Sequence, residues 1–112
     1  MKPLSGSCDA NAKCLVSTEI ESLLRQLDGW EVIDEAGIQK LKRKYFTKNY
    51  TQSMLLANEV ATLAASANHH PQLIVEYSSL TIVWWSHKIK GLHKNDFIMA
   101  AKTSELFLHC GS

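Results

Sequence analysis

Two adjacent histidines followed by a proline are the residues of this chain best suited to chemistry. His69, His70 and Pro71 come at the end of an alanine-rich stretch with helical spacing and directly before a run of strand-forming residues. Pro71 cannot continue a helix, and it drives the preceding residue out of the helical region. We therefore expect both imidazoles at a corner between two rigid elements. Since free imidazole has a pKa of about 6.5, such groups can donate or accept a proton near neutral pH.

Further polar residues follow this corner. His87 closes the strand-like run, with Ser86 beside it, and Asp96 stands near the start of the last predicted helix. Three histidines at the ends of fixed elements favour general acid–base catalysis. Asp96 could orient an imidazole or bind a substrate N–H; in the plainer alternative it only stabilises the first turn of its helix, by about 0.3–1 kcal/mol. We expect the histidines at 69, 70 and 87 and Asp96 to converge on one pocket.

A metal site is the sharper alternative for the same residues. His69, His70 and His87 with Asp96 have side chains that bind zinc or iron. Adjacent histidines point in different directions, however, and the chain contains none of the familiar ligand spacings. We therefore expect no metal. Nucleophilic catalysis is also disfavoured, because the cysteines lie outside this segment and Ser86 beside His87 is a weak pairing.

The composition describes one small soluble domain. The chain has 112 residues, of which 46% are hydrophobic and 21% charged, and this size fits a single core. Lys+Arg 12 against Asp+Glu 11 leave a net charge of +1, so we expect neither nucleic acid nor membrane as a partner. No apolar run approaches the roughly 20 residues of a membrane span, and no signal-peptide pattern is present. The cysteines number 3 without close pairing, which predicts no disulfide framework and a cytoplasmic location.

The elements that position these residues alternate between helices and hairpins. Residues 1–16 lack apolar periodicity and are predicted to form a mobile leader, with a single domain over 17–112. Ser17 is the expected cap of the first helix, and Ser78-Ser79 the turn of the second hairpin. The order indicates an α+β fold with an antiparallel sheet and helices on one face. The expected helix, hairpin, helix, hairpin and helix cover 17–28, 30–46, 49–68, 73–86 and 95–110.

Two strand patterns suggest how the sheet meets its surroundings. In the run 80–86, bulky apolar residues alternate onto both faces. One face can cover the helices, and the other indicates an oligomer. Trp84 and Trp85 could stack a flat heterocycle, but packing is the favoured role for tryptophans in strand alternation. The basic cluster 40–44 is expected on an edge strand, where lysines block pairing with other chains, rather than in an anion-binding patch.

The chain resembles the pterin-4a-carbinolamine dehydratases. The residues that carry the resemblance are Asn68-His69-His70-Pro71, Tyr77, Ser86-His87, and Gly91-Leu92 followed by Asp96, and it extends back to Gly29-Trp30. The resemblance covers most of the chain except the leader. It implies a four-stranded antiparallel sheet with helices on one side, assembled as a homodimer or homotetramer. It also implies dehydration of 4a-hydroxytetrahydropterin, released by aromatic amino-acid hydroxylases, to quinonoid dihydropterin.

The implied reaction suits histidines. An acid must protonate the hydroxyl leaving C4a, and a base must take a proton from a ring nitrogen; neither step needs a metal or redox cofactor. The resemblance implies His69 and His87 as the acid and base. His70 joins them at the catalytic site and holds the pterin, while Asp96 and Ser86 support substrate binding.

The chain departs from the family pattern at three positions. Ala65 stands where the family often has a glutamate, and Leu73 where an aromatic residue is common. His93 replaces the usual Ser or Thr cap of the last helix, which should weaken the cap by about 1 kcal/mol. Ala65, Leu73 and the apolar strand face motivate an alternative function: a non-catalytic module of the same fold that binds or dimerises with a protein partner.

Overall fold

The chain folds in the predicted order of elements. The computed structural model describes residues 14–110, with side chains to residue 108. The helices and strands alternate as expected for the α+β class, which confirms the predicted fold. The elements are α1 (Ser17–Leu24), β1 (Glu31–Glu35), β2 (Ile38–Phe46), α2 (Tyr50–Ala67), β3 (Gln72–Glu76), β4 (Ser79–Trp84) and α3 (Lys94–Cys110).

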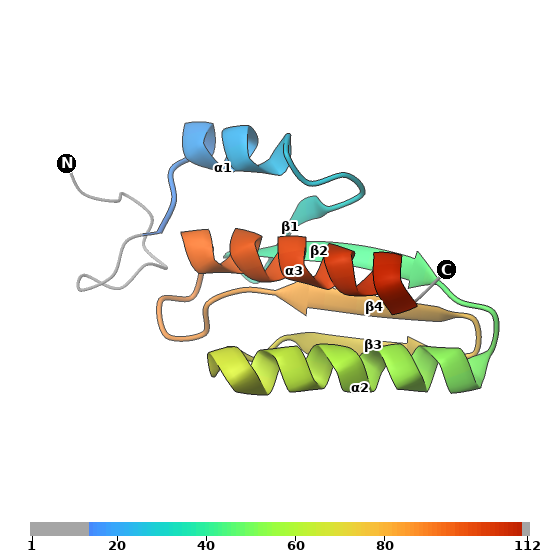
Figure 1. Cartoon of the computed structure of the whole chain (residues 1–112). Helices are drawn as coiled ribbons and strands as arrows, with labels where there is room; N and C mark the ends of the chain where they lie inside the picture. The colour runs from blue at the N-terminus through green and yellow to red at the C-terminus, as the bar shows by residue number, and fades with distance from the viewer. Residues whose placement is uncertain (1–13, 111–112) are drawn as a thin grey trace.

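The four strands form one antiparallel sheet in the order β1-β2-β4-β3. The helices cover one face of it, with α2 and α3 side by side along the strands (Figure 1). Alternate residues of the two central strands, such as Leu41 and Ile82, pack there against Leu56, Val60 and the α3 side chains. The core therefore lies between the sheet and a single layer of helices.

The predicted edge position of the lysine cluster is wrong. Strand β2 pairs with both β1 and β4, so the cluster lies on an interior strand. Its lysines lie on the open face of the sheet, opposite the helices. Lys40 Nζ lies 2.8 Å from Glu35 Oε1 and 4.0 Å from the ring centre of Trp85. Its ammonium holds the pKa of the exposed Glu35 carboxyl below the usual range. The lysines thus cover the open face of the sheet instead of blocking an edge.

Both hairpins turn through two residues. Ala36 and Gly37 have φ of 53° and 82°, the positive values that a tight hairpin turn of type I′ requires at both central positions. In the second hairpin Glu76 pairs with Ser79, so Tyr77 and Ser78 form the turn and the predicted Ser78-Ser79 turn is one residue late. The Ser79 hydroxyl instead donates to the Glu76 carboxylate, at 2.9 Å, inside the sheet.

The cap of helix α1 lies one residue earlier than predicted, and the helix ends sooner. Its N-cap is Val16, not Ser17, and the Val16 N–H is satisfied by the Glu19 carboxylate, 3.0 Å away. The helix ends at Leu24 rather than reaching residue 28. The chain then turns to Gly29, whose φ is +85°. A Cβ at Gly29 would lie 2.5 Å from the guanidinium carbon of Arg43, so a larger residue would strain the backbone and also displace the end of the Arg43 side chain.

The end of α2 delivers the histidine corner. Asn68 adopts the left-handed conformation, with φ 52° and ψ 43°, which is a common way to end a helix. The N–H groups of Asn68 and His69 donate to the carbonyls of Ala65 and Ala64 at 3.2 and 3.1 Å. Pro71 and β3 follow at once. His69 is therefore held by the helix on one side and the sheet on the other, as the sequence predicted.

The last residues of the predicted leader contact the domain. Residues 1–13 lie outside the described part, whereas the N–H of Leu15 donates to the Leu92 carbonyl at 3.0 Å. Cys14 is buried and disulfide-bonded. The sequence predicted no disulfide framework, and this bond was not foreseen, because spacing along the chain does not reveal which cysteines meet. No helix within residues 14–110 is long and apolar enough to cross a membrane.

Candidate active site

Three chain segments meet at one end of the sheet. The end of α2, the loop after β4 and the start of α3 come together at the left of Figure 1. They enclose a cavity of about 480 Å³ into which all three predicted histidines open. Its lining is Asn68, His69, His70, Ser86, His87, Lys88, Ile89, His93 and Asn95. The three histidines that were predicted to converge therefore line one cavity.

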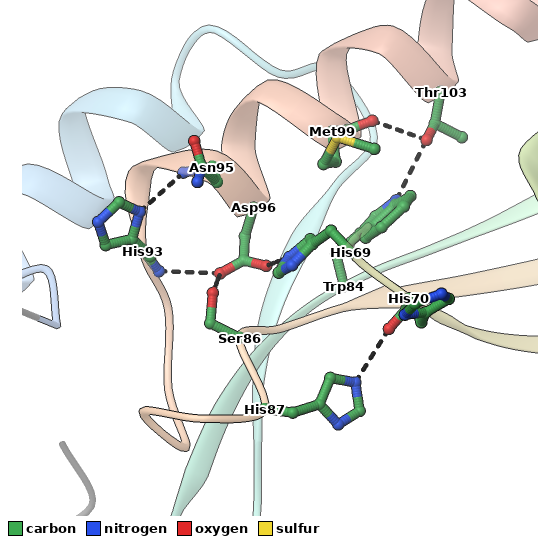
Figure 2. A network of polar contacts seen from close by, with 10 residues as sticks. All are labelled: His69, His70, Trp84, Ser86, His87, His93, Asn95, Asp96, Met99 and Thr103. Carbon is green, nitrogen blue, oxygen red and sulfur yellow. Dashed lines mark hydrogen bonds and ion pairs between the residues drawn. The ribbon is translucent and has the colours of Figure 1, made fainter. Parts of the chain in front are cut away.

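Asp96 lies behind this cavity and joins the three segments. Its side chain is 0% exposed. Its carboxylate lies 2.6 Å from His69 Nε2 and 2.8 Å from both the Ser86 hydroxyl and the His93 backbone nitrogen (Figure 2). An ionised carboxylate only accepts hydrogen bonds, and all three partners can donate. Asp96 is thus held as an anion, and His69 carries its proton on Nε2.

The ring of His69 is also fixed from one side. It stacks on the buried indole of Trp84, with ring centres 5.6 Å apart and an interplanar angle of 4°. The indole N–H donates to the Thr103 hydroxyl at 3.1 Å, and that hydroxyl donates to the Met99 carbonyl at 2.7 Å. Since Nε2 is held by Asp96, the nitrogen left for a ligand is Nδ1. Trp84 packs in the core, as predicted, and supports the site as well.

His87 is oriented in a similar way. Its Nε2 lies 2.9 Å from the backbone carbonyl of His70, which can only accept, so Nε2 donates (Figure 2). The ring packs against Trp85 at 4.4 Å between centres. Among the described residues no group bonds Nδ1 of either His69 or His87. Two imidazoles therefore present the same nitrogen, unprotonated in the neutral form, in one cavity.

His93 has a role that the sequence reasoning missed. The sequence predicted that it weakens the cap of the last helix. In the structure it is half-buried, and its Nδ1 accepts from the N–H of Asn95 at 3.2 Å. Its own N–H donates to Asp96, so the two residues form a reciprocal cap. In the sequence, an acidic residue three positions after His93, Asp96, indicates this arrangement.

The other two departures lie away from the chemistry. Ala65 is exposed on α2 and does not line the cavity, and Leu73 is half-buried against the core. The charge that orients His69 comes from Asp96. Within residues 14–110 no group of three His, Cys, Asp or Glu side chains is placed to hold a metal ion.

Comparison with known proteins places the chain in a family. Residues 13–106 match the family described as pterin 4 alpha carbinolamine dehydratase. The chain belongs to this family. A relative from Vibrio cholerae is 47% identical over 100 residues, covering 89% of this chain and 92% of its own, and one from Nitrosococcus oceani is 44% identical over 103 residues, covering 92% and 91%. Both are named "Putative pterin-4-alpha-carbinolamine dehydratase". The predicted family and its hydro-lyase class are confirmed.

Solved structures share the fold. A protein from Brucella melitensis titled transcriptional coactivator/pterin dehydratase has a TM-score of 0.76 at 24% identity, covering 84% of this chain and 98% of its own. A pterin dehydratase-like protein described as a RuBisCO assembly factor in the alpha-carboxysome has a TM-score of 0.59 at 18% identity, covering 70% and 88%. At these identities the likeness concerns the fold alone.

Proposed function

We propose that this protein dehydrates 4a-hydroxytetrahydropterins to quinonoid dihydropterins by histidine acid–base catalysis. The observation that carries the proposal is the pair of imidazoles in one cavity, His69 and His87, each with Nε2 held by a protein acceptor. Each therefore offers Nδ1 to a ligand. Membership in the dehydratase family supports the substrate class.

The reaction divides between an acid and a base. The C4a–O bond breaks as the leaving hydroxyl takes a proton and departs as water, while N5 loses its proton and the C4a=N5 bond forms. Asp96, 2.6 Å from His69, stabilises the protonated ring, so we assign His69 as the acid. Among the described residues no carboxylate pairs with His87, whose side chain is exposed, so it can take the N5 proton and release it to water.

The remaining site residues bind the substrate or position His69. The His70 side chain is exposed at the cavity, and we assign it to holding the pterin ring. Asp96 is fully buried, and the Ser86 hydroxyl already donates to it. We therefore assign both as positioning residues for His69 and not as direct substrate contacts, which revises the role expected from the sequence.

The decisive experiment follows the decay of a 4a-carbinolamine by stopped flow with the purified protein. We expect acceleration over the uncatalysed decay, and His69→Ala and His87→Ala should each lower kcat by about 10²–10⁴-fold. His70→Ala should act mainly on KM. Circular dichroism checks that each variant is folded. A folded wild-type protein that leaves the decay rate unchanged would refute catalysis and favour the alternative of a binding module.

We also propose that the protein is a homo-oligomer and that an aromatic amino-acid hydroxylase supplies its substrate. No described helix covers the sheet face that carries Ile74, which is 40% exposed, and Trp85. Exposed apolar groups of this kind mark association surfaces. Light scattering should give at least twice the monomer mass, and Ile74→Lys should lower it. A monomer at all concentrations would contradict the oligomer.

A further inference from the structure

The segments that build the cavity carry charge of one sign. Residues 60–75 contain no lysine, arginine, aspartate or glutamate, and residues 77–95 contain Lys88, Lys90 and Lys94 without an acidic residue. Within the described chain, the carboxylate that adjoins the site is Asp96, which is 0% exposed. It accepts hydrogen bonds from three donors and does not itself line the cavity. The charge exposed to a ligand is therefore positive.

The helix ends do not reverse this sign. The C-terminal carbonyls of a helix carry partial negative charge, but at the end of α2 those of Ala64 and Ala65 accept N–H groups from Asn68 and His69. The positive N-terminal end of α3 is already occupied by Asp96. A helix terminus carries only about half an elementary charge, less than the full charge of a lysine ammonium, so neither terminus reverses the sign.

Lys88 is the cation that reaches the cavity. It lines the cavity and is exposed, whereas Lys90, on the same loop, does not line it. No carboxylate of the described residues lies within ion-pair distance of Lys88. Its neighbours in the lining are almost all polar, among them Asn68, Asn95 and His70. An ammonium with polar donors around it suits an anionic group.

We infer that Lys88 makes the site selective for pterins whose C6 substituent carries a negative charge, a phosphate monoester or a carboxylate. The inference rests on the proposed function, since it concerns the part of the substrate beyond the reacting ring. The bicyclic pterin would lie between the imidazoles of His69 and His87, and its charged substituent would extend toward the loop that holds Lys88. The charge would add selectivity without taking part in the dehydration.

Binding of stable dihydropterins tests this inference separately from catalysis. Three ligands are compared by calorimetry: one with a neutral polyol at C6, one with the same polyol as a phosphate monoester, and one ending in a carboxylate. We expect the anionic ligands to bind about three- to fivefold more tightly at low salt, as one exposed ion pair allows. This preference should shrink as ionic strength rises. A preference for only one of the two anions would identify the recognised group as the phosphate or the carboxylate.

Two lysine variants on one loop provide the matched comparison. Lys88→Gln should remove the preference for the anionic ligands, while Lys90→Gln, which changes the protein charge equally, should retain it. Equal affinities for neutral and anionic ligands, or a preference that survives Lys88→Gln, would overturn the inference while the proposed dehydratase stands. Failure of all three ligands to bind would contradict the proposed function itself and the inference with it.

Discussion

Asp96 combines a structural and a chemical task in one side chain. As the acidic residue in the first turn of α3 it receives the His93 N–H, and as a buried anion it holds His69. The sequence left open whether this aspartate only stabilises a helix or also orients a histidine. The structure shows both, because the first turn of α3 faces the histidine corner.

Replacing Asp96 with asparagine should therefore affect rate and stability together. In Asp96→Asn the side-chain amide places an N–H₂ donor where the carboxylate accepted hydrogen bonds from other donors. His69 also loses the charge that stabilises its protonated form. We expect kcat to fall by about 10³-fold, as when a buried aspartate behind a catalytic histidine is lost. Stability should fall by about 1–3 kcal/mol, measured by urea unfolding.

A second variant separates charge from geometry. Ser86→Ala removes one donor to Asp96 and keeps its carboxylate, so kcat should fall far less than in Asp96→Asn. Stopped flow compares the two variants. An unchanged kcat in Asp96→Asn would show that the charge plays no role.

The cap at His93 gives a second test at the residue scale. Because its ring accepts from Asn95 N–H, His93→Ser supplies a hydroxyl to the same helix end and should keep the thermal stability within a few degrees. His93→Ala has no acceptor and should lose about 1 kcal/mol. Thermal unfolding distinguishes them. Equal stability of the two variants would mean that the ring does not cap α3.

At the scale of elements, α3 supports the histidine corner from within the core. Thr103 accepts from the Trp84 indole, which stacks on His69. Thr103→Val keeps the shape but leaves the indole N–H unpaired, at a cost of about 1–3 kcal/mol. We expect kcat to fall about tenfold, since small displacements of a catalytic group are costly.

Thr103→Ser is the matched control, because it keeps the hydroxyl. It should hold kcat close to the wild type, and the two variants are compared by stopped flow at a temperature where both are folded. If Thr103→Val loses stability with unchanged kcat, Trp84 supports the fold but does not position His69.

Two turn glycines, one before β1 and one between β1 and β2, differ in what surrounds them. Gly29 and Gly37 have nearly the same φ, +85° and +82°, but a Cβ meets Arg43 at Gly29 and nothing within 4 Å at Gly37. Gly37→Ala should cost about 1 kcal/mol of backbone strain. Gly29→Ala should cost more, because it also displaces Arg43 from the Asp28 carbonyl. Chemical denaturation of both variants measures the difference.

For the whole molecule, local patterns predicted most of the architecture. Helical spacing located α2 and α3, and alternation located the strands, because a one-sided core enforces these periods. Helix and turn ends were less predictable. Ser17 had the right side chain for a cap, yet Glu19 satisfied the helix start one residue earlier. Competing capping groups within one turn leave the boundary open.

Strand order and pairings between distant residues were beyond local patterns. The lysines of β2 suggested an edge, but β4 pairs with β2 from residues 33 to 43 positions away in the chain. The histidines at 69 and 87 were predicted to meet, whereas their tautomers depend on contacts with Asp96 and the His70 carbonyl that only the fold creates. The residue types thus predicted which chemistry the site could do. The tertiary structure determines which nitrogen of each ring is left for a ligand.

The three donors on Asp96 come from the corner after α2, the loop after β4 and the entry to α3. The His93 contact is local to the first turn of α3, but the complete set of three cannot exist until all three segments have docked. The site is therefore a late product of folding, and a partly assembled chain with an intact sheet would be inert. During refolding, catalytic competence should return with the last packing step rather than with the first appearance of secondary structure.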